Sequence, residues 1–264
     1  MRGSQGTIRH YTRYRFRSEA RTALFWTLGI CLYAGVLVAI YPSVKGAVDI
    51  SAMPANLREA FNINDFSQLA SFLAAELFGV ILAIITPFFG IIMLSNIVAG
   101  AEERGRLDVL LGNPIPRWNL IVGSFVVAAT YLLAIVLVLG LVLWIEASLL
   151  DLALSLRQAM RATFALWPLT LAFAALALAV STLVRQRALA MGIPAAILFL
   201  MYLANVIGRL APDISGIRWL SAYNYYGTAI TEGIWWWGMV TLVIAALVLV
   251  GTAIVSFDRR DIYA

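Results

Sequence analysis

The densest group of charged side chains in this chain lies between two long apolar runs, in the stretch AGAEERGRLDVLLGNPIPRWNL, residues 99–120. Its six charged residues are Glu102, Glu103, Arg104, Arg106, Asp108 and Arg117. Glycine and proline follow most of these charges, so the chain is expected to turn sharply before the next apolar run begins. A short, rigid, charged segment of this kind suits docking to another protein, because a mobile loop would lose more entropy on binding.

Several classes of enzyme are excluded by residues that the chain lacks. Its single histidine, His10, cannot form an HExxH zinc motif. The Glu102-Glu103 pair could suggest an intramembrane protease, but such a site needs histidines on other spans, and the predicted spans have none. The only lysine, Lys45, stands in PSVKG, so no phosphate-binding GxxxxGK[ST] loop exists. Cys31 is the only cysteine, which leaves no disulfide or zinc cluster. We therefore expect no catalytic residue, no metal site and no cofactor in this chain.

The composition indicates a membrane protein. Of the 264 residues, 62% are hydrophobic and only 12% are charged, and the mean hydropathy is +0.89. A bilayer core needs about 20 mostly apolar residues per helical span. Six runs meet this requirement: Ala23–Tyr41, Leu69–Val98, Trp118–Glu146, Thr163–Val184, Ala188–Gly208 and Trp237–Phe257. The prediction is an all-α integral membrane protein with one transmembrane domain (1–264), a six-span bundle (23–257) and a short tail (258–264).

The basic residues predict the orientation. With the N-terminus inside, thirteen of the nineteen lysine and arginine residues fall in inside segments, as the positive-inside rule requires. Both termini and residues 99–117 are then cytoplasmic, in a multi-pass protein of the cell membrane. The net charge of +5 is mostly an orientation signal, and we expect no nucleic-acid partner.

The N-terminal segment, residues 7–22, predicts a helix lying on the inner membrane surface. Four arginines recur every four residues and so form one stripe, with aromatic residues beside it. They are Arg9, Arg13, Arg17 and Arg21. Such a stripe would contact anionic lipid head groups before the chain bends into the first span. The alternative is a basic tail without regular structure.

The outer segments carry the remaining candidates. Glu76 and Glu146 lie near the outer ends of their spans, where each is either part of a transport pathway or a solvated span end. Pro87 is expected to kink the second span. Short helices are expected at residues 55–61 and, before the sixth span, in the aromatic segment 211–236; a helical shoulder is expected at residues 149–161.

The charged stretch itself predicts an amphipathic helix over residues 98–112. Glu103, Leu107, Leu110 and Leu111 share one face at the three- and four-residue spacing, and Gly112 is suited to end the helix. The alternative, a solvated turn between spans, accounts for the charges but not for the leucine face or the double proline.

The sequence ERGRLDVLLGNPIPR, residues 103–117, resembles the E-x-G-T-L-E-x-L-L-x-x-P-x-x-R signature of ABC-2-type transporter permeases. The matching residues are Glu103, Gly105, Leu107, Leu110, Leu111, Pro114 and Arg117. Asp108 stands in place of the usual glutamate, and Arg106 and Pro116 replace the common threonine and serine. The N-terminal helix, the six spans and the aromatic segment before the sixth span are also similar to that family.

The resemblance implies an exporting permease that pairs with a second copy or a sister permease and with separate ATPase subunits, which bind ATP and Mg²⁺. The coupling helix would comprise Glu102, Glu103, Arg104, Arg106, Leu107, Asp108, Leu110 and Leu111. Its turn would comprise Gly105, Gly112, Pro114, Pro116 and Arg117. Arg185 and Arg187 would add a second cytoplasmic contact. The apolar spans favour an amphiphilic or lipid-like cargo. Two alternatives remain: an ion-coupled secondary carrier, and a membrane assembly protein without transport.

Overall fold

The structure, a computed structural model, describes residues 2–45, 68–105 and 116–260. The short helix expected at residues 55–61 lies outside the described residues, as do the last four residues of the tail. Among the described residues the regular structure is helical throughout.

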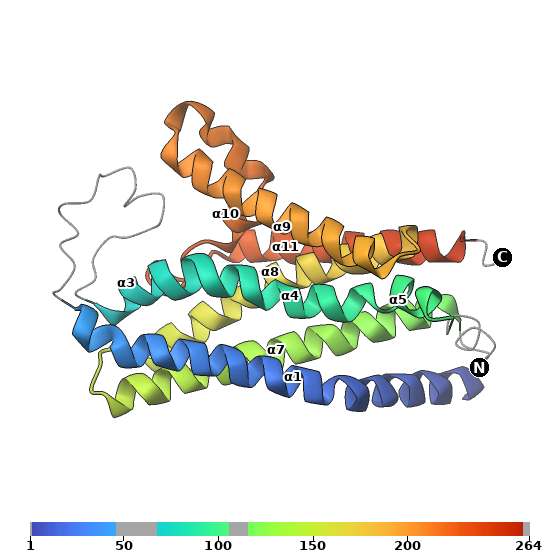
Figure 1. Ribbon diagram of the computed structural model, residues 1–264, viewed down its shortest axis with the longest axis horizontal. Helices are drawn as coiled ribbons and strands as arrows, with labels where there is room; N and C mark the ends of the chain where they lie inside the picture. The colour runs from blue at the N-terminus through green and yellow to red at the C-terminus, as the bar shows by residue number, and fades with distance from the viewer. Residues whose placement is uncertain (1, 46–67, 106–115, 261–264) are drawn as a thin grey trace.

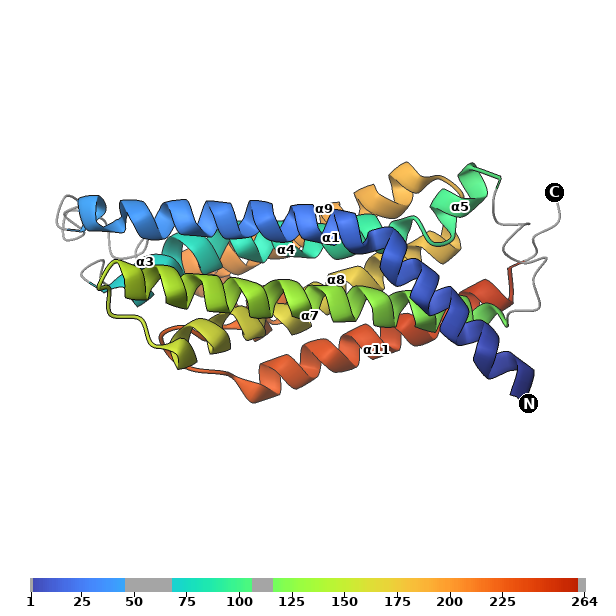
Figure 2. The same ribbon diagram turned by 90° about the horizontal axis from the view of Figure 1, so that it is seen from below.

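Six stretches are long and apolar enough to cross a membrane, which confirms the prediction of six spans. They are α1 (Arg2–Val44), the run α3 (Leu69–Leu73), η2 (Ala74–Ile81) and α4 (Leu82–Ser95), then α7 (Arg117–Leu149), α8 (Leu156–Leu183), α9 (Arg187–Leu210) and α11 (Trp236–Asp258). Figures 1 and 2 show these helices running lengthwise in one bundle, with both termini at the same end. We name this the terminal end and the opposite one the distal end.

The alanine-rich helix α8 lies at the centre of the bundle and packs against α4, α7 and α11. In its most apolar window 78% of the residues are buried, against 22% in α1. Small residues let the helices approach closely: a Cβ on Gly90 of α4 would lie 2.7 Å from the Cβ of Ala174 in α8. The bundle is therefore held by close helix packing around α8, with the other spans exposing apolar side chains outward.

Helix α1 differs from the prediction. We expected a separate surface helix over residues 7–22, but α1 is continuous from Arg2 to Val44. The physical reason is that residues 7–22 contain no glycine or proline that would end a helix. Figure 2 shows the first part of α1 bending away from the bundle. The side chains of Arg17 and Arg21 are exposed, whereas those of Arg9 and Arg13 lie outside the described part.

The second span is irregular near the distal end. Residues 74–81 form a π-helix, a rare structure that often marks functional positions. Gly79 permits this wide turn, because a Cβ there would lie 2.9 Å from the Ala74 carbonyl oxygen. Farther along, Pro87 lacks the N–H that would bond the Ala83 carbonyl. This span therefore needs hydrogen-bond donors from another part of the chain.

Two short helices precede the sixth span, as expected: η3 (Pro212–Leu220) and α10 (Ala222–Tyr226). Helix α10 supplies the missing donors. The Tyr223 hydroxyl donates to the Ala83 carbonyl over 3.1 Å, and the Tyr226 hydroxyl donates to the Phe78 carbonyl over 3.5 Å. Burial raises the pKa of both phenols, so both remain protonated donors.

The prediction of a helical shoulder over residues 149–161 is wrong in its bounds. Helix α7 continues to Leu149, and α8 begins at Leu156 behind a capping box of Ser155 and Gln158. The capping box starts the helix seven residues before the predicted span begins, so only a short turn connects the two spans.

Candidate functional site

The charged stretch after the second span begins with a short helix, α5 (Ala99–Glu103), at the terminal end. The continuous helix predicted over 98–112 is wrong in the part that the structure describes, because α5 ends at Glu103. Gly105 has φ of +62°, a left-handed conformation that ends helices and that glycine adopts without strain. The residues of the predicted site that lie outside the described part are Arg106, Leu107, Asp108, Leu110, Leu111, Gly112 and Pro114.

Glu102 connects α5 to the end of the chain. Its carboxylate accepts a hydrogen bond from Arg260 Nη2 over 2.7 Å and lies 3.6 Å from Arg185 Nε. The Arg260 pair is partly buried, with 14% of the arginine side chain and 29% of the glutamate side chain exposed. The Arg185 side chain is 71% exposed, so its contribution is small. Arg260 is therefore the main partner of Glu102.

Arg260 also contacts the end of α8. Its Nη1 donates to the carbonyls of Thr182 and Val184 over 3.0 and 3.4 Å. These carbonyls lack helical partners, since they belong to the last turn of α8 and the residue after it. A guanidinium at a helix C-terminus also interacts favourably with the helix dipole. One side chain thus joins α5, the end of α8 and the segment that follows α11.

Glu103 connects α5 to the start of α9. Its carboxylate accepts a hydrogen bond of 2.7 Å from the backbone N–H of Arg187, the first residue of α9. The first N–H groups of a helix have no intrahelical acceptor, and a negative charge there is favourable. Glu103 therefore acts as a cap supplied from outside α9, although its side chain is exposed.

Arg104 folds back over α5. Its Nε donates to the Gly100 carbonyl over 2.7 Å, and its Nη2 donates to the Asn96 side-chain oxygen over 3.1 Å. Asn96 in turn donates to the Ile92 carbonyl at the end of α4. These contacts fix α5 against the end of the second span.

Arg117 has a role that the sequence did not indicate. It was predicted to belong to the turn after the coupling helix, together with the exposed Pro116. Instead its Nη1 donates to three carbonyls at the end of α11, those of Phe257, Asp258 and Arg260, over 3.0 to 3.3 Å. Its guanidinium also lies 5.7 Å from the centre of the Phe257 ring. Arg117 therefore caps the sixth span from the start of the third.

Taken together, four side chains join the ends of five helices at the terminal end. Glu102, Glu103, Arg117 and Arg260 each satisfy groups on an element other than their own. Sequence reasoning identified three of them but missed Arg260, which lies in the predicted short tail, residues 258–264. This network connects α5 to the ends of α8 and α9 and to the segment after α11.

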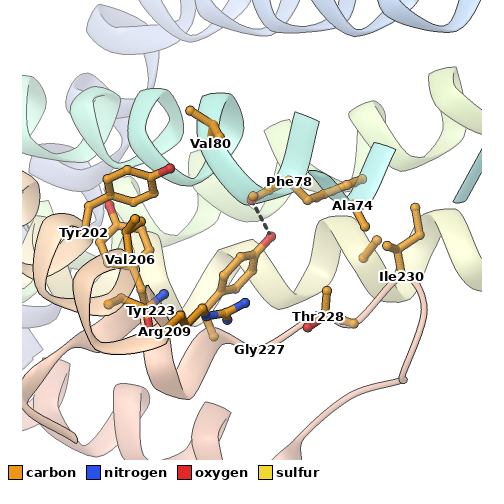
Figure 3. A pocket seen from close by; sticks show the side chains of 15 residues that line it. Ala74, Phe78, Val80, Tyr202, Val206, Arg209, Tyr223, Gly227, Thr228 and Ile230 are labelled. Carbon is orange, nitrogen blue, oxygen red and sulfur yellow. Dashed lines mark hydrogen bonds between the residues drawn. The ribbon is translucent and has the colours of Figure 1, made fainter. Parts of the chain in front are cut away.

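A second candidate feature is a pocket at the distal end, between η2, α9, α10 and the segment after α10. Figure 3 shows Tyr202 and Arg209 of α9 on one side of this pocket, with Thr228 and Phe78 on other sides. The dashed line in Figure 3 is the bond from the Tyr226 hydroxyl to the Phe78 carbonyl. The aromatic residues of α10 thus form a wall of the pocket as well as supporting the second span.

The two acidic pathway candidates lie at the distal end but in different surroundings. Glu76 of η2 is exposed. Glu146, near the end of α7, is half-buried against α1, where a Cβ on Gly35 would overlap its carboxylate. Its Oε2 is buried and has no hydrogen-bond partner among the described residues. Within residues 2–45, 68–105 and 116–260, no group of three histidine, cysteine or acidic residues could hold a metal ion.

Comparison with known proteins agrees with this architecture. The model of the family described as ABC-2 family transporter protein matches residues 15–262, which is nearly the whole chain. No curated protein matches the chain significantly.

Proposed function

Because the chain belongs to the ABC-2 transporter family, as a membrane permease of an ABC transporter, we propose that it couples ATP hydrolysis by separate ATPase subunits to export of an amphiphilic or lipid-like cargo. The observation that carries this proposal is the charged network at the terminal end. There α5, which follows the second span, is bonded to the start of α9 and to Arg260 beyond α11.

The proposed coupling is mechanical. An ATPase that docks beside α5 and closes on binding ATP and Mg²⁺ would push α5 toward the membrane. The bonds from Glu103 to α9 and from Glu102 through Arg260 to α8 are 2.7 Å long at the carboxylates, so these spans would move with α5. Residues 106–111, the rest of the predicted coupling helix, would supply the other contacts with the ATPase. Arg185, which is exposed beside Glu102, would supply the second contact together with Arg187.

The assembly that follows from this proposal contains two permease subunits, identical or sister chains, and two ATPases on the cytoplasmic side. The terminal end is then cytoplasmic, and the exposed Arg17 and Arg21 of α1 face lipid head groups there. The pathway would run between the two permeases, whose outward faces are apolar.

The test begins with purification of the chain from its native membrane in mild detergent, followed by assay of the co-purified ATPase in liposomes. Glu103→Lys should abolish the stimulated ATP hydrolysis, because a lysine would place positive charge against the positive start of α9. Glu103→Gln should keep part of it, since the amide oxygen still accepts a hydrogen bond. Full stimulation of ATP hydrolysis in the Glu103→Lys complex would contradict the proposal. So would purification of the chain without any ATPase under conditions that keep other membrane complexes intact.

A secondary carrier is the competing function, and Glu146 is the observation that favours it. A half-buried carboxylate without a partner among the described residues could bind and release a proton. Flux driven by a proton gradient in vesicles that lack the ATPase, and lost in Glu146→Gln, would support the carrier. ATP-dependent activity that is unchanged in Glu146→Gln would exclude it.

A further inference from the structure

The distal pocket adjoins a wider polar recess. The pocket itself has a volume of about 40 Å³, enough for roughly three water molecules. The recess has about 340 Å³, and the two share Arg209, Gly227 and Thr228 as lining residues. Ligand sites start at about 300 Å³, so the recess is large enough to receive the head group of a small amphiphile.

The recess is positively charged. Arg209 and Arg218 both line it, and Glu232, which is exposed, is its one acidic lining residue. The Arg218 Nε is buried and has no hydrogen-bond partner among the described residues. Its stem crosses α9 at Gly208, where a Cβ would lie 2.5 Å from Arg218 Cγ. Glycine at position 208 therefore leaves the space that the Arg218 stem occupies against α9.

The scaffold around these arginines is well bonded. Tyr225 stacks on Trp235 at 5.9 Å and donates to the Trp219 carbonyl over 3.1 Å, which connects η3 to the start of α11. Arg161 of α8 donates to the Ile230 carbonyl over 2.7 Å. The loop that carries Thr228 and Glu232 is thus held by a third arginine, while Arg209 and Arg218 line the recess.

Asn205 supplies a further polar group of the pocket, a hydrogen-bond acceptor. It lies one turn before Arg209 on α9, lines the pocket and is 8% exposed. Its side-chain oxygen is buried and lacks a hydrogen-bond partner among the described residues. A buried acceptor left unbonded costs free energy, so a ligand donor at this position would be favourable.

We propose that this pocket and recess bind a phosphate ester that carries a hydroxyl group, as the head-group site of the exported amphiphile. The two arginines face the phosphate, and Asn205 accepts a hydrogen bond from the hydroxyl. This inference rests on the proposed function for its role in export. The binding itself requires no ATPase and is tested separately.

The experiment uses the purified full chain in neutral detergent, without ATPase, and measures binding of short-chain lipids by calorimetry. Dihexanoyl phosphatidylglycerol should bind, and dihexanoyl phosphatidylcholine, which has no net charge, should bind at least about tenfold more weakly. Arg218→Gln and Arg209→Gln should each weaken phosphatidylglycerol binding about tenfold. The matched control is Arg157→Gln, since Arg157 is exposed at the same end and lines neither cavity.

The hydroxyl is tested with dihexanoyl phosphatidylmethanol, which has the same charge but no hydroxyl. Asn205→Leu should weaken binding of phosphatidylglycerol and leave that of phosphatidylmethanol unchanged. Glycerol 3-phosphate distinguishes the sources of the group: equal affinity would assign the site to a soluble phosphate ester, and much weaker affinity to a lipid. Equal binding of charged and uncharged lipids, or arginine variants that elute as folded protein with wild-type affinity, would overturn the proposal. Either result would leave the ATPase coupling test unaffected.

Discussion

Arg260 and Glu102 are 158 residues apart in the sequence, yet their guanidinium and carboxylate lie 2.7 Å apart at the terminal end of the bundle. The pair fixes the short helix α5 to the residue that follows the sixth span by two positions. Because Arg260 also holds two carbonyls at the end of α8, the pair is one part of a contact among three elements. Its strength can be separated from that of its neighbours by mutation.

Arg260→Gln should lower the free energy of unfolding by about 1–2 kcal/mol, because it removes a charge-assisted bond and two carbonyl contacts. Glu102→Gln should cost less, since Arg260 retains its carbonyl partners. The measurement is a denaturing-detergent titration of both variants and of the double variant. Arg259→Gln is the matched control, because Arg259 is exposed and adjacent in sequence. Equal decreases in the free energy of unfolding for Arg259→Gln and Arg260→Gln would refute the contacts assigned to Arg260.

Arg117→Gln should loosen the end of α11. The arginine holds three carbonyls there and lies over the Phe257 ring, so its loss should cost about 1–2 kcal/mol locally. Hydrogen exchange of the amides at residues 255–260 should become faster, while that of α8 should not change. Arg117→Lys should restore part of the protection, since it keeps the charge near the helix end. Unchanged exchange in Arg117→Gln would show that the cap has no effect.

Tyr223→Phe should destabilise the second span, because the Ala83 carbonyl would lose its tyrosine donor next to Pro87. A buried carbonyl without a partner costs about 1–3 kcal/mol. Pro87→Ala supplies a backbone N–H to the same carbonyl, so the tyrosine substitution should cost less in that background. Comparing the two single variants with the double variant by detergent titration gives the coupling directly. Strict additivity would mean that the hydroxyl and the proline do not act on the same group.

The six spans could be predicted because a run of about 20 apolar residues crosses a lipid bilayer as a helix. Only a helix satisfies all the backbone hydrogen bonds of such a segment internally. Helix ends set by local chemistry were harder to predict, as α5 shows. The leucine spacing favours a helix over residues 98–112, whereas the left-handed Gly105 ends it after Glu103. A glycine followed by arginine carries no signal strong enough to decide between these outcomes.

Contacts between distant segments were beyond sequence reasoning. Arg117 and Arg260 have no local feature that indicates which helix end each would cap, because that depends on how the spans pack. The same holds for the π-helix at residues 74–81. Its Phe78 carbonyl accepts a hydrogen bond from the Tyr226 hydroxyl, 148 residues farther along the chain. Glu102, Glu103 and Arg117 did stand out in advance, because charge is rare in this chain, but their partners did not.

The buried tyrosines predict a specific loss of stability in alkali. Burial raises the pKa of Tyr223 and Tyr226 above the ordinary value of 10.0, so the folded chain keeps both protons after the unfolded chain has lost them. Their contribution to stability is therefore full below about pH 10 and declines as the pH rises beyond it. Detergent titrations between pH 8 and 11 should show this decline, and the double variant Tyr223→Phe, Tyr226→Phe should show a shallower one. Absorbance at alkaline pH provides the independent check, because two tyrosines should resist ionisation until the chain unfolds. An identical pH slope in the wild-type chain and the double variant would mean that these phenols are as accessible to hydroxide as those on the surface.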